Sequence, residues 1–219
     1  QCQSQLQTEL PEQQFNTWIR ALVVQPGFDG RVQLLAPNRF IEDCDNRIGQ
    51  KNNHKAVMDI LSKAIESPNQ LFDQFGEPTQ GGIQKIYQSD KFSILNVVWT
   101  PNMSIMPHNH NMWAAIGVYS GREDNIFWRR LDNKENGKIE AAGAKSLETF
   151  DAVPLGSDII HSVINPTNKF TCALHIYGGD FFEADKSSWE PDTLEEQQYE
   201  VEQSHKTFNE ANKRAEIKV

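Results

Sequence analysis

Two histidines lie one residue apart near the middle of the chain, in the stretch PHNHNMW at 107–113. In a β-strand, residues i and i+2 point to the same face, so His108 and His110 can direct two ring nitrogens toward one point. The preceding stretch, 92–101, is rich in β-branched and aromatic residues, which favours a strand. The spacing is typical of a metal site that takes a third ligand from elsewhere; a chance pair in a polar loop is the alternative.

Two more histidines occur in apolar, strand-like stretches. His161 lies in DIIHSVIN and His175 lies in CALHIYGGD. A lone histidine in such a strand is most often a core or surface residue, but a closing barrel can bring His161 to the HxH pair. Three neutral imidazoles with open positions suit Fe(II), and Ni, Zn and Mn also accept them. His54 and His205 fall in helical or tail segments and receive no role.

These histidines lie in a region, residues 83 to about 182, that reads as short strands separated by turn signals. The pattern predicts a mainly β fold, an antiparallel barrel or jelly roll whose interior can hold a ligand. The predicted strands are 83–88, 92–99, 104–109, 113–119, 124–131, 146–150, 159–164 and 171–177.

The segments on either side of the barrel differ from it in pattern. Before it, Pro11 opens a predicted helix, residues 23–36 form a predicted hairpin, and a second helix is expected at roughly 54–75. After it, residues 193–219 are a charged tail, expected to be helical and solvated because it has little apolar face.

Composition limits the classes of partner. The 219 residues carry a formal net charge of -9 and no cluster of Lys and Arg, so nucleic acid is not expected as a partner. No run of 18 apolar residues occurs, and the first residues lack the pattern of a signal peptide, so no membrane partner is expected. The three scattered cysteines form no disulfide framework, which fits a cytoplasmic location.

The string VVWTPNMSIMPHNHNMWAAIGVYSGREDN, with VPLGSDIIHSVINP and ALHIYGGDFF after it, resembles the cupin superfamily. More narrowly, residues 39–192 resemble the cysteine dioxygenase-like branch of thiol dioxygenases. The resemblance implies a double-stranded β-helix (jelly-roll) barrel with N-terminal helices. It implies that His108, His110 and His161 hold mononuclear non-haem iron, and that His175 and Tyr177 act beside the substrate. The implied reaction uses O2 to oxidise a small thiol to a sulfinic acid.

The ligand block departs from the family pattern. General cupins have a metal-binding Glu a few residues after HxH, where this chain has Trp113, Ala114 and Ala115. Glu123 comes too late in the sequence to fill that role. Ala115 also stands where some family members have a Cys that crosslinks to the tyrosine.

The residues expected beside the substrate also depart from the family pattern. The Ser of the family's Ser-His-Tyr relay corresponds to Ala173, while Cys172 is one position off and faces the other way in a strand. No Arg for a substrate carboxylate is evident, and Lys85 and Arg122 are the candidates. These departures leave cysteine itself in doubt as the substrate, and a different small thiol or another small acid is the alternative. Asn109, Asn111 and Asn165 lie near the ligands in sequence and have no assigned role, and Trp99 and Trp113 could wall the pocket, with plain core aromatics as the alternative.

The stretch QLQTELPEQQFNTWIRAL, with VQLLAPNRF after it, resembles part of the N-terminal domain of the bacterial replication initiator DnaA. In that family the domain is a protein-interaction module. The expected organisation is thus 1–40 as this partial domain, 41–82 as a helical lead-in, 83–192 as the barrel and 193–219 as the tail. Residues 1–40 could also mediate a homodimer. A non-catalytic metal- or ligand-binding module, or an interaction protein acting through residues 1–40, are the alternatives to an enzyme.

Overall fold

The structure is a computed structural model that describes residues 23–26, 32–35, 39–48, 53–132 and 137–216. The chain divides into two compact units, residues 1–46 and 47–219. In the first unit, β1 (Val23–Pro26) and β2 (Val32–Leu35) pair antiparallel, in agreement with the predicted hairpin, and α3 (Arg39–Ile48) follows. The helix predicted from Pro11 lies outside the described residues.

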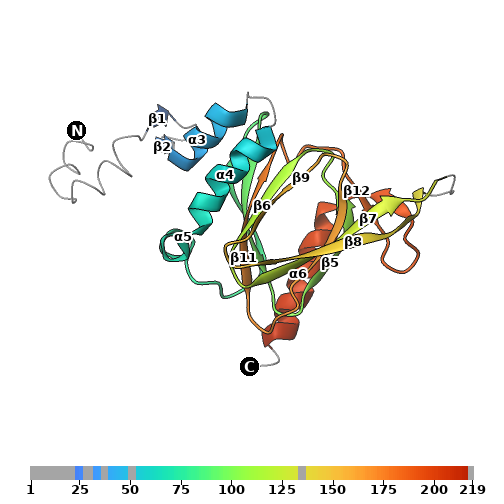
Figure 1. The fold of residues 1–219 in the computed structure, drawn as a ribbon. Coiled ribbons are helices and arrows are strands. Elements are labelled where there is room, and N and C mark those ends of the chain that lie inside the picture. The colour runs from blue at the N-terminus through green and yellow to red at the C-terminus, as the bar shows by residue number, and fades with distance from the viewer. Residues whose placement is uncertain (1–22, 27–31, 36–38, 49–52, 133–136, 217–219) are drawn as a thin grey trace. The chain divides into compact units, whose positions relative to one another are not determined.

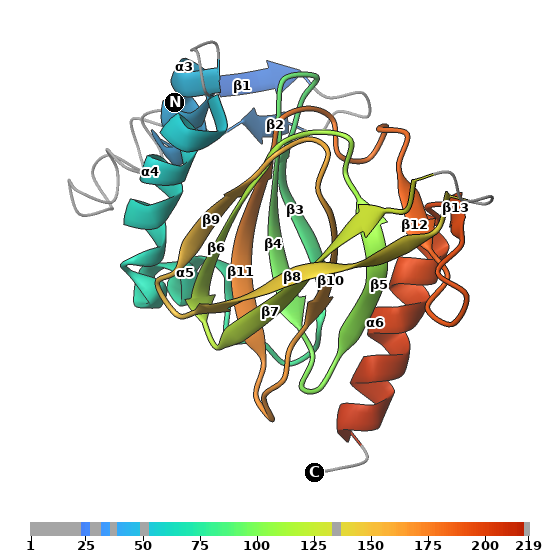
Figure 2. The same ribbon diagram turned by 45° about the vertical axis from the view of Figure 1, so that its right-hand side comes forward.

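The second unit is built on two antiparallel sheets that face each other (Figure 2). The five-stranded sheet has the order β3 (Gly82–Gln88), β4 (Ser93–Trp99), β11 (Thr171–Tyr177), β6 (Ala114–Ser120) and β9 (Ala152–Leu155). The six-stranded sheet has the order β13 (Glu196–Gln198), β12 (Ser187–Trp189), β5 (Ser104–Asn109), β10 (Ile160–Ile164), β7 (Arg122–Arg130) and β8 (Ile139–Glu148). Neighbouring strands such as β4 and β11 are far apart in sequence, as in a jelly-roll double-stranded β-helix, and the predicted fold class is confirmed.

Most of the predicted strands match observed strands to within two residues, because their apolar side chains face the interior. The predicted strand 146–150 is instead the end of the longer β8, most of whose residues are exposed. Since residues 141–146 are exposed on both faces, this part of β8 shows no alternation of apolar and polar residues. The short strands β9, β12 and β13 were not predicted, and β9 contains Pro154, which normally argues against a strand.

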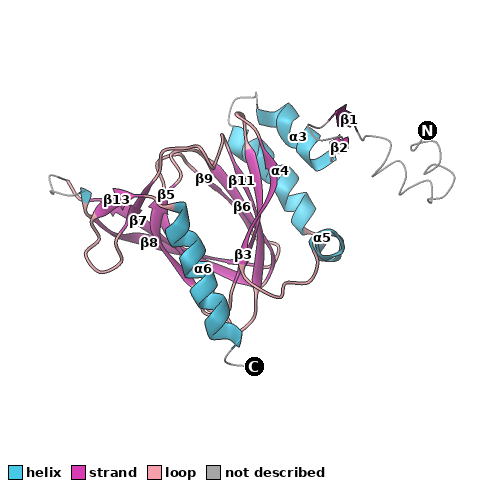
Figure 3. Cartoon of the chain, turned by 180° about the vertical axis from the view of Figure 1, so that it is seen from behind, coloured by secondary structure: helices cyan, strands magenta, loops and turns pink. Residues whose placement is uncertain are grey.

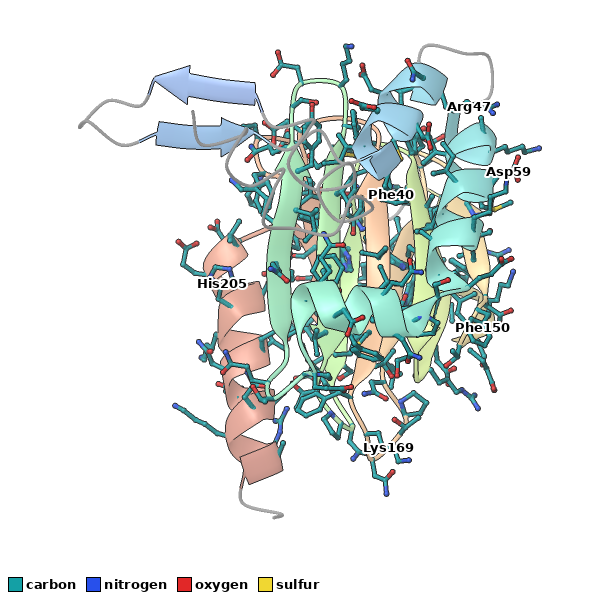
Figure 4. The ribbon with its side chains drawn as sticks, turned by 90° about the vertical axis from the view of Figure 1, so that its left-hand side faces the viewer. Phe40, Arg47, Asp59, Phe150, Lys169 and His205 are labelled. Carbon is teal, nitrogen blue, oxygen red and sulfur yellow. The ribbon has the colours of Figure 1, made fainter. Side chains whose placement is uncertain are left out.

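Two helices, α4 (Asn53–Ile65) and α5 (Pro68–Phe75), cover the outer face of the five-stranded sheet (Figures 1 and 4). One continuous helix was predicted here, but Pro68 disfavours a helical conformation at the residue before it and starts a new helix instead. The α4 side chains pack closely on β6, where a Cβ added to Gly117 would lie 2.9 Å from Cγ of Leu61. A glycine at this position therefore lets the helix approach the sheet.

The C-terminal helix α6 (Val201–Glu216) lies along the side of the barrel (Figure 3). The expected solvated helix is a wrong description of this segment, because Phe208 and Ala211 are buried in the main hydrophobic core. The ring of Phe208 stacks on Trp99 with 5.6 Å between the ring centroids. A few apolar residues thus anchor an otherwise charged helix. Among the described helices none is both long and apolar enough to cross a membrane.

Candidate metal centre

The pairing of β5 with β10 brings the three predicted ligands together. His108 lies directly opposite His161 in the antiparallel register, and His110 follows one residue after the end of β5. The candidate ligand nitrogens of the three side chains all lie within 4.8 Å of one another. Each imidazole is buried, and no carboxylate belongs to this group among the residues that the structure describes. We call His108, His110 and His161 the three-histidine cluster.

Hydrogen bonds on the far side of two rings fix which nitrogen faces the centre of the cluster. His108 Nδ1 lies 2.9 Å from the carbonyl oxygen of Met106, and His161 Nδ1 lies 2.6 Å from Oδ1 of Asn125. Both partners are acceptors, so Nδ1 carries the proton in each ring. The lone pair of Nε2 is then free in both, which is the arrangement that metal-binding histidines use.

The electrostatics of the cluster fit a cation. Burial lowers the pKa of His108 to about 4 and lowers the pKa of His110 and His161 well below the usual range, so the rings are neutral at neutral pH. Nε2 of His161 lies 3.2 Å from Nε2 of His110, a separation that two nitrogens binding one metal ion can have. Three neutral imidazoles with converging lone pairs are a donor set for a divalent metal such as Fe(II), Zn, Ni or Mn.

A buried carboxylate on β7 supports the cluster from behind. Glu123 Oε1 accepts a hydrogen bond of 3.0 Å from Nδ2 of Asn125, the residue that orients His161. Its Oε2 accepts a 2.7 Å bond from the indole of Trp99 and lies 3.5 Å from Nε2 of His175. Burial alone would raise the pKa of Glu123, but the nearby His175 and these hydrogen bonds outweigh it, and the pKa stays below its usual range. Glu123 is therefore a buried anion.

The predicted catalytic pair, His175 and Tyr177, lies on β11 in the opposite sheet. His175 Nδ1 is 2.9 Å from the hydroxyl oxygen of Tyr177, and both side chains are buried. On the other side of the ring, the carboxylate of Glu123 can only accept, which favours a proton on Nε2 of His175. The ring of Tyr177 lies 4.9 Å from that of His110, measured between centroids. The pair thus stands beside the three-histidine cluster.

Two positions that depart from the family pattern face opposite sides of β11, as strand alternation requires. Ala173 belongs to the core of the barrel. Cys172 instead lines a cavity of about 300 Å³ on the outer side of the sheet, together with Tyr119. Burial raises the pKa of the Cys172 thiol to about 11, so this cysteine is not a reactive group at neutral pH.

The three asparagines that lie near the ligands in sequence form hydrogen bonds with the backbone of loops and turns. Asn109 accepts from the amide of Ser187, Asn111 donates to the carbonyl of Asp185, and Asn165 bonds to a turn. The residue that orients His161 is Asn125, which the sequence reasoning missed. Asn125 is 36 positions away in sequence, and only the pairing of β7 with β10 brings it close.

The two candidate pocket tryptophans have structural contacts. Trp99 lies in the core and holds Glu123, whereas the half-buried Trp113 covers the backbone at Gly178. A Cβ added to Gly178 would lie 1.9 Å from Nε1 of Trp113. This close approach is the reason for a glycine just after Tyr177.

Neither cation proposed from the sequence for a substrate carboxylate lies at the cluster. Lys85 is exposed and donates to Gln88, and Arg122 is paired with Asp124 on the other side of its strand from Glu123. Neither side chain is therefore placed beside the three histidines. The cation that the structure places in the interior is Lys186, which is only 4% exposed and was not singled out in the sequence.

Comparison with known proteins gives two separate likenesses. The family model of the DnaA N-terminal domain matches residues 1–44. Among solved structures, a double-stranded β-helix protein of Klebsiella pneumoniae is similar at 12% identity, with a TM-score of 0.40 over 53% of this chain and 86% of that one. A protein of Bacillus halodurans gives 15% identity and a TM-score of 0.41 over 50% and 77%. A Cupin 2 conserved barrel domain protein of Salinispora arenicola gives 18% and 0.34 over 43% and 72%. With TM-scores this low, the fold assignment rests on the strand order.

Proposed function

We propose that the chain is a metal-dependent oxidoreductase, a mononuclear non-haem iron dioxygenase that oxidises a small thiol to a sulfinate. The observation that carries the proposal is the three-histidine cluster beside the His175–Tyr177 pair. The resemblance to thiol dioxygenases over residues 39–192 supports the same reaction. We propose Fe(II) as the metal, while Ni, Zn or Mn would also fit three imidazoles.

The reaction balances without a further reductant. A thiolate and one O2 give a sulfinate, in which both oxygen atoms are bonded to sulfur. Sulfur loses four electrons and the two oxygen atoms gain them, and the thiol proton is released to water or to a base. Bound Fe(II) supplies positions at which the thiolate and O2 meet and exchange electrons.

The side chains of this chain hold those positions in place. Met106 and Asn125 fix the rings of His108 and His161, so their Nε2 lone pairs stay directed at the centre. Tyr177 carries its hydroxyl next to the cluster, and His175 holds that hydroxyl through Nδ1. Because burial excludes water from this region, hydrogen bonds to the reacting atoms are stronger than in solution.

The test is O2 uptake by protein loaded anaerobically with Fe(II), assayed against a panel of small thiols. We expect uptake with at least one thiol, formation of the sulfinate, and loss of both in His161→Ala. The matched control is His205→Ala, which removes an exposed histidine on α6 (Figure 4) and should leave uptake unchanged. One bound iron without uptake from any thiol would overturn the proposal and favour the non-catalytic binding module.

The remaining sequence-based assignments stay predictions. A homodimer through residues 1–40, a partner-binding role of that segment and a cytoplasmic location are not needed for the chemistry at the cluster. The match of residues 1–44 to the DnaA N-terminal domain supports a protein-interaction role for this segment. Deletion of residues 1–40 with iron binding intact would separate that role from catalysis.

A further inference from the structure

The six-stranded sheet ends in a long strand with an exposed outer edge. β8 pairs with β7 along one side, and among the described residues no strand pairs with its other side (Figure 2). Residues 141–146 of this strand are exposed to solvent on both faces. The backbone amide and carbonyl groups of such an edge can form hydrogen bonds with a further strand. The edge of β8 is therefore open to a partner.

The other edge strands of the two sheets carry features that discourage such pairing. β13 and β9 are only three and four residues long, and β9 contains Pro154. β3 has a bulge between Lys85 and Tyr87 and is half-buried along most of its length. Short strands, proline and bulges are usual ways to prevent edge-to-edge association. β8 is instead ten residues long, and its middle, residues 141–144, has only small side chains.

A bulge in β8 places two opposite charges on the same face of the strand. The β7 residues opposite Glu140 and Lys145 are Arg129 and Asn125, which are four positions apart and therefore share a face. Glu140 and Lys145 are five positions apart, which in a regular strand would direct them to opposite faces. They share a face here because Ala142 is an extra residue in the register with β7.

The segment from Glu140 to Lys145, EAAGAK, is complementary to itself when two copies run antiparallel. A two-fold axis perpendicular to the sheet, between Ala142 and Gly143, would place Glu140 of each copy opposite Lys145 of the other on the same face. The small residues between them let the two backbones approach. Within the described residues Lys145 forms no ion pair, and the Glu140 side chain, which pairs with Arg129, remains 44% exposed. Both charges are thus available to a second copy.

We propose that β8 is an interaction surface for a second copy of this chain. The two β8 strands pair antiparallel about residues 142–143 and join the six-stranded sheets of both copies into one continuous sheet. Backbone hydrogen bonds along the two edges and two Glu140–Lys145 pairs hold the dimer together. The interface uses neither the three-histidine cluster nor residues 1–40, so it is independent of the proposed function and of a dimer through that segment.

The test is sedimentation equilibrium of the full chain over a range of protein concentrations. We expect the wild type to dimerise, and Lys145→Glu and Glu140→Lys each to weaken the dimer by about 10-fold or more, because like charges then face each other at two places. An equimolar mixture of the two variants should associate as the wild type does, because every opposing pair again has opposite charges. Lys169→Glu is the matched control, an exposed lysine outside β8 with the same change of charge, and should leave the dimer unchanged (Figure 4).

Hydrogen exchange then tests whether the strand edges themselves pair. At a concentration where the wild type is dimeric, the amides of residues 139–146 should exchange more slowly than in Lys145→Glu, and thermal unfolding checks that each variant is folded. A wild type that stays monomeric at all concentrations would overturn the proposal. So would single variants that associate as well as the wild type, as expected for a dimer through residues 1–40, or a mixture that associates no better than its two components.

Discussion

The six-stranded sheet and the five-stranded sheet both direct buried polar side chains into the barrel, but with different chemistry. The six-stranded side contributes the three-histidine cluster, whose neutral lone pairs converge and suit a cation. The five-stranded side contributes His175 and Tyr177, which form a hydrogen-bonded pair. One sheet thus holds the candidate metal, and the other presents a proton-carrying group beside it.

Glu123 connects the two sides. It belongs to β7 in the six-stranded sheet, where it supports Asn125, and it reaches across to Trp99 and His175 in the five-stranded sheet. Ala173 on β11 offers no polar side chain to His175, and the carboxylate that faces Nε2 of His175 comes from the opposite sheet. The comparison teaches that a buried histidine in one sheet can take its polar neighbour from a strand of the other sheet, far away in sequence.

The largest difference in metal affinity should appear between a variant of the six-stranded sheet and a variant of the five-stranded sheet. We expect His161→Ala to weaken binding of Fe(II) or Zn by more than about 100-fold, because one of three ligand nitrogens is lost. His175→Ala should leave metal affinity unchanged, since its ring contacts Tyr177 and Glu123. Metal titration followed by calorimetry measures both. Equal losses in the two variants would show that the sheets do not divide the chemistry in this way.

The sequence predicted the parts of this division that depend on local patterns. The HxH spacing and strand alternation placed His108 and His110 together, and the apolar run around His161 placed that residue in the barrel. The same alternation put Cys172 and Ala173 on opposite faces of β11. Each of these inferences needs only the period of a strand.

The parts that were missed depend on pairing between distant strands. Asn125 meets His161 through the pairing of β7 with β10, and Glu123 meets His175 only because the two sheets face each other. Lys186 looks like an ordinary charge in a polar loop until the fold buries it. Phe208 is likewise a single aromatic residue in a charged helix, and its burial depends on where α6 meets the barrel.

The connection through Glu123 can be broken by removing its charge and keeping its shape. In Glu123→Gln, one oxygen becomes an amide that cannot accept, so either the indole of Trp99 or the amide of Asn125 loses its partner. We expect a loss of about 3 kcal/mol in the free energy of unfolding, as for a buried charged acceptor. Denaturant unfolding measures it. Glu140→Gln is the control, an exposed carboxylate on β8 whose change should cost less than about 0.5 kcal/mol. Similar values for both would show that Glu123 does not stabilise the interior.

A substitution next to the three-histidine cluster should cause a smaller loss of metal affinity. Asn125→Ala removes the acceptor of His161 Nδ1 and leaves the three ligands in place. We expect metal affinity to fall by about 10- to 100-fold, because a ring without its outer hydrogen bond is less well oriented. Asn111→Ala, which removes a loop contact near the cluster, should not change it. A metal titration in which Asn125→Ala equals the wild type would remove Asn125 from the site.

The smallest effect should come from the five-stranded side. Tyr177→Phe removes only the hydroxyl that lies 2.9 Å from Nδ1 of His175. We expect a loss of about 1 kcal/mol in the free energy of unfolding, the usual value for one hydrogen bond, with metal affinity unchanged. Tyr87→Phe on β3 is a control in the same sheet, at a half-buried position. Weaker metal binding in Tyr177→Phe would mean that the hydroxyl also orients His110, whose ring it neighbours, and the division between the two sheets would then be incomplete.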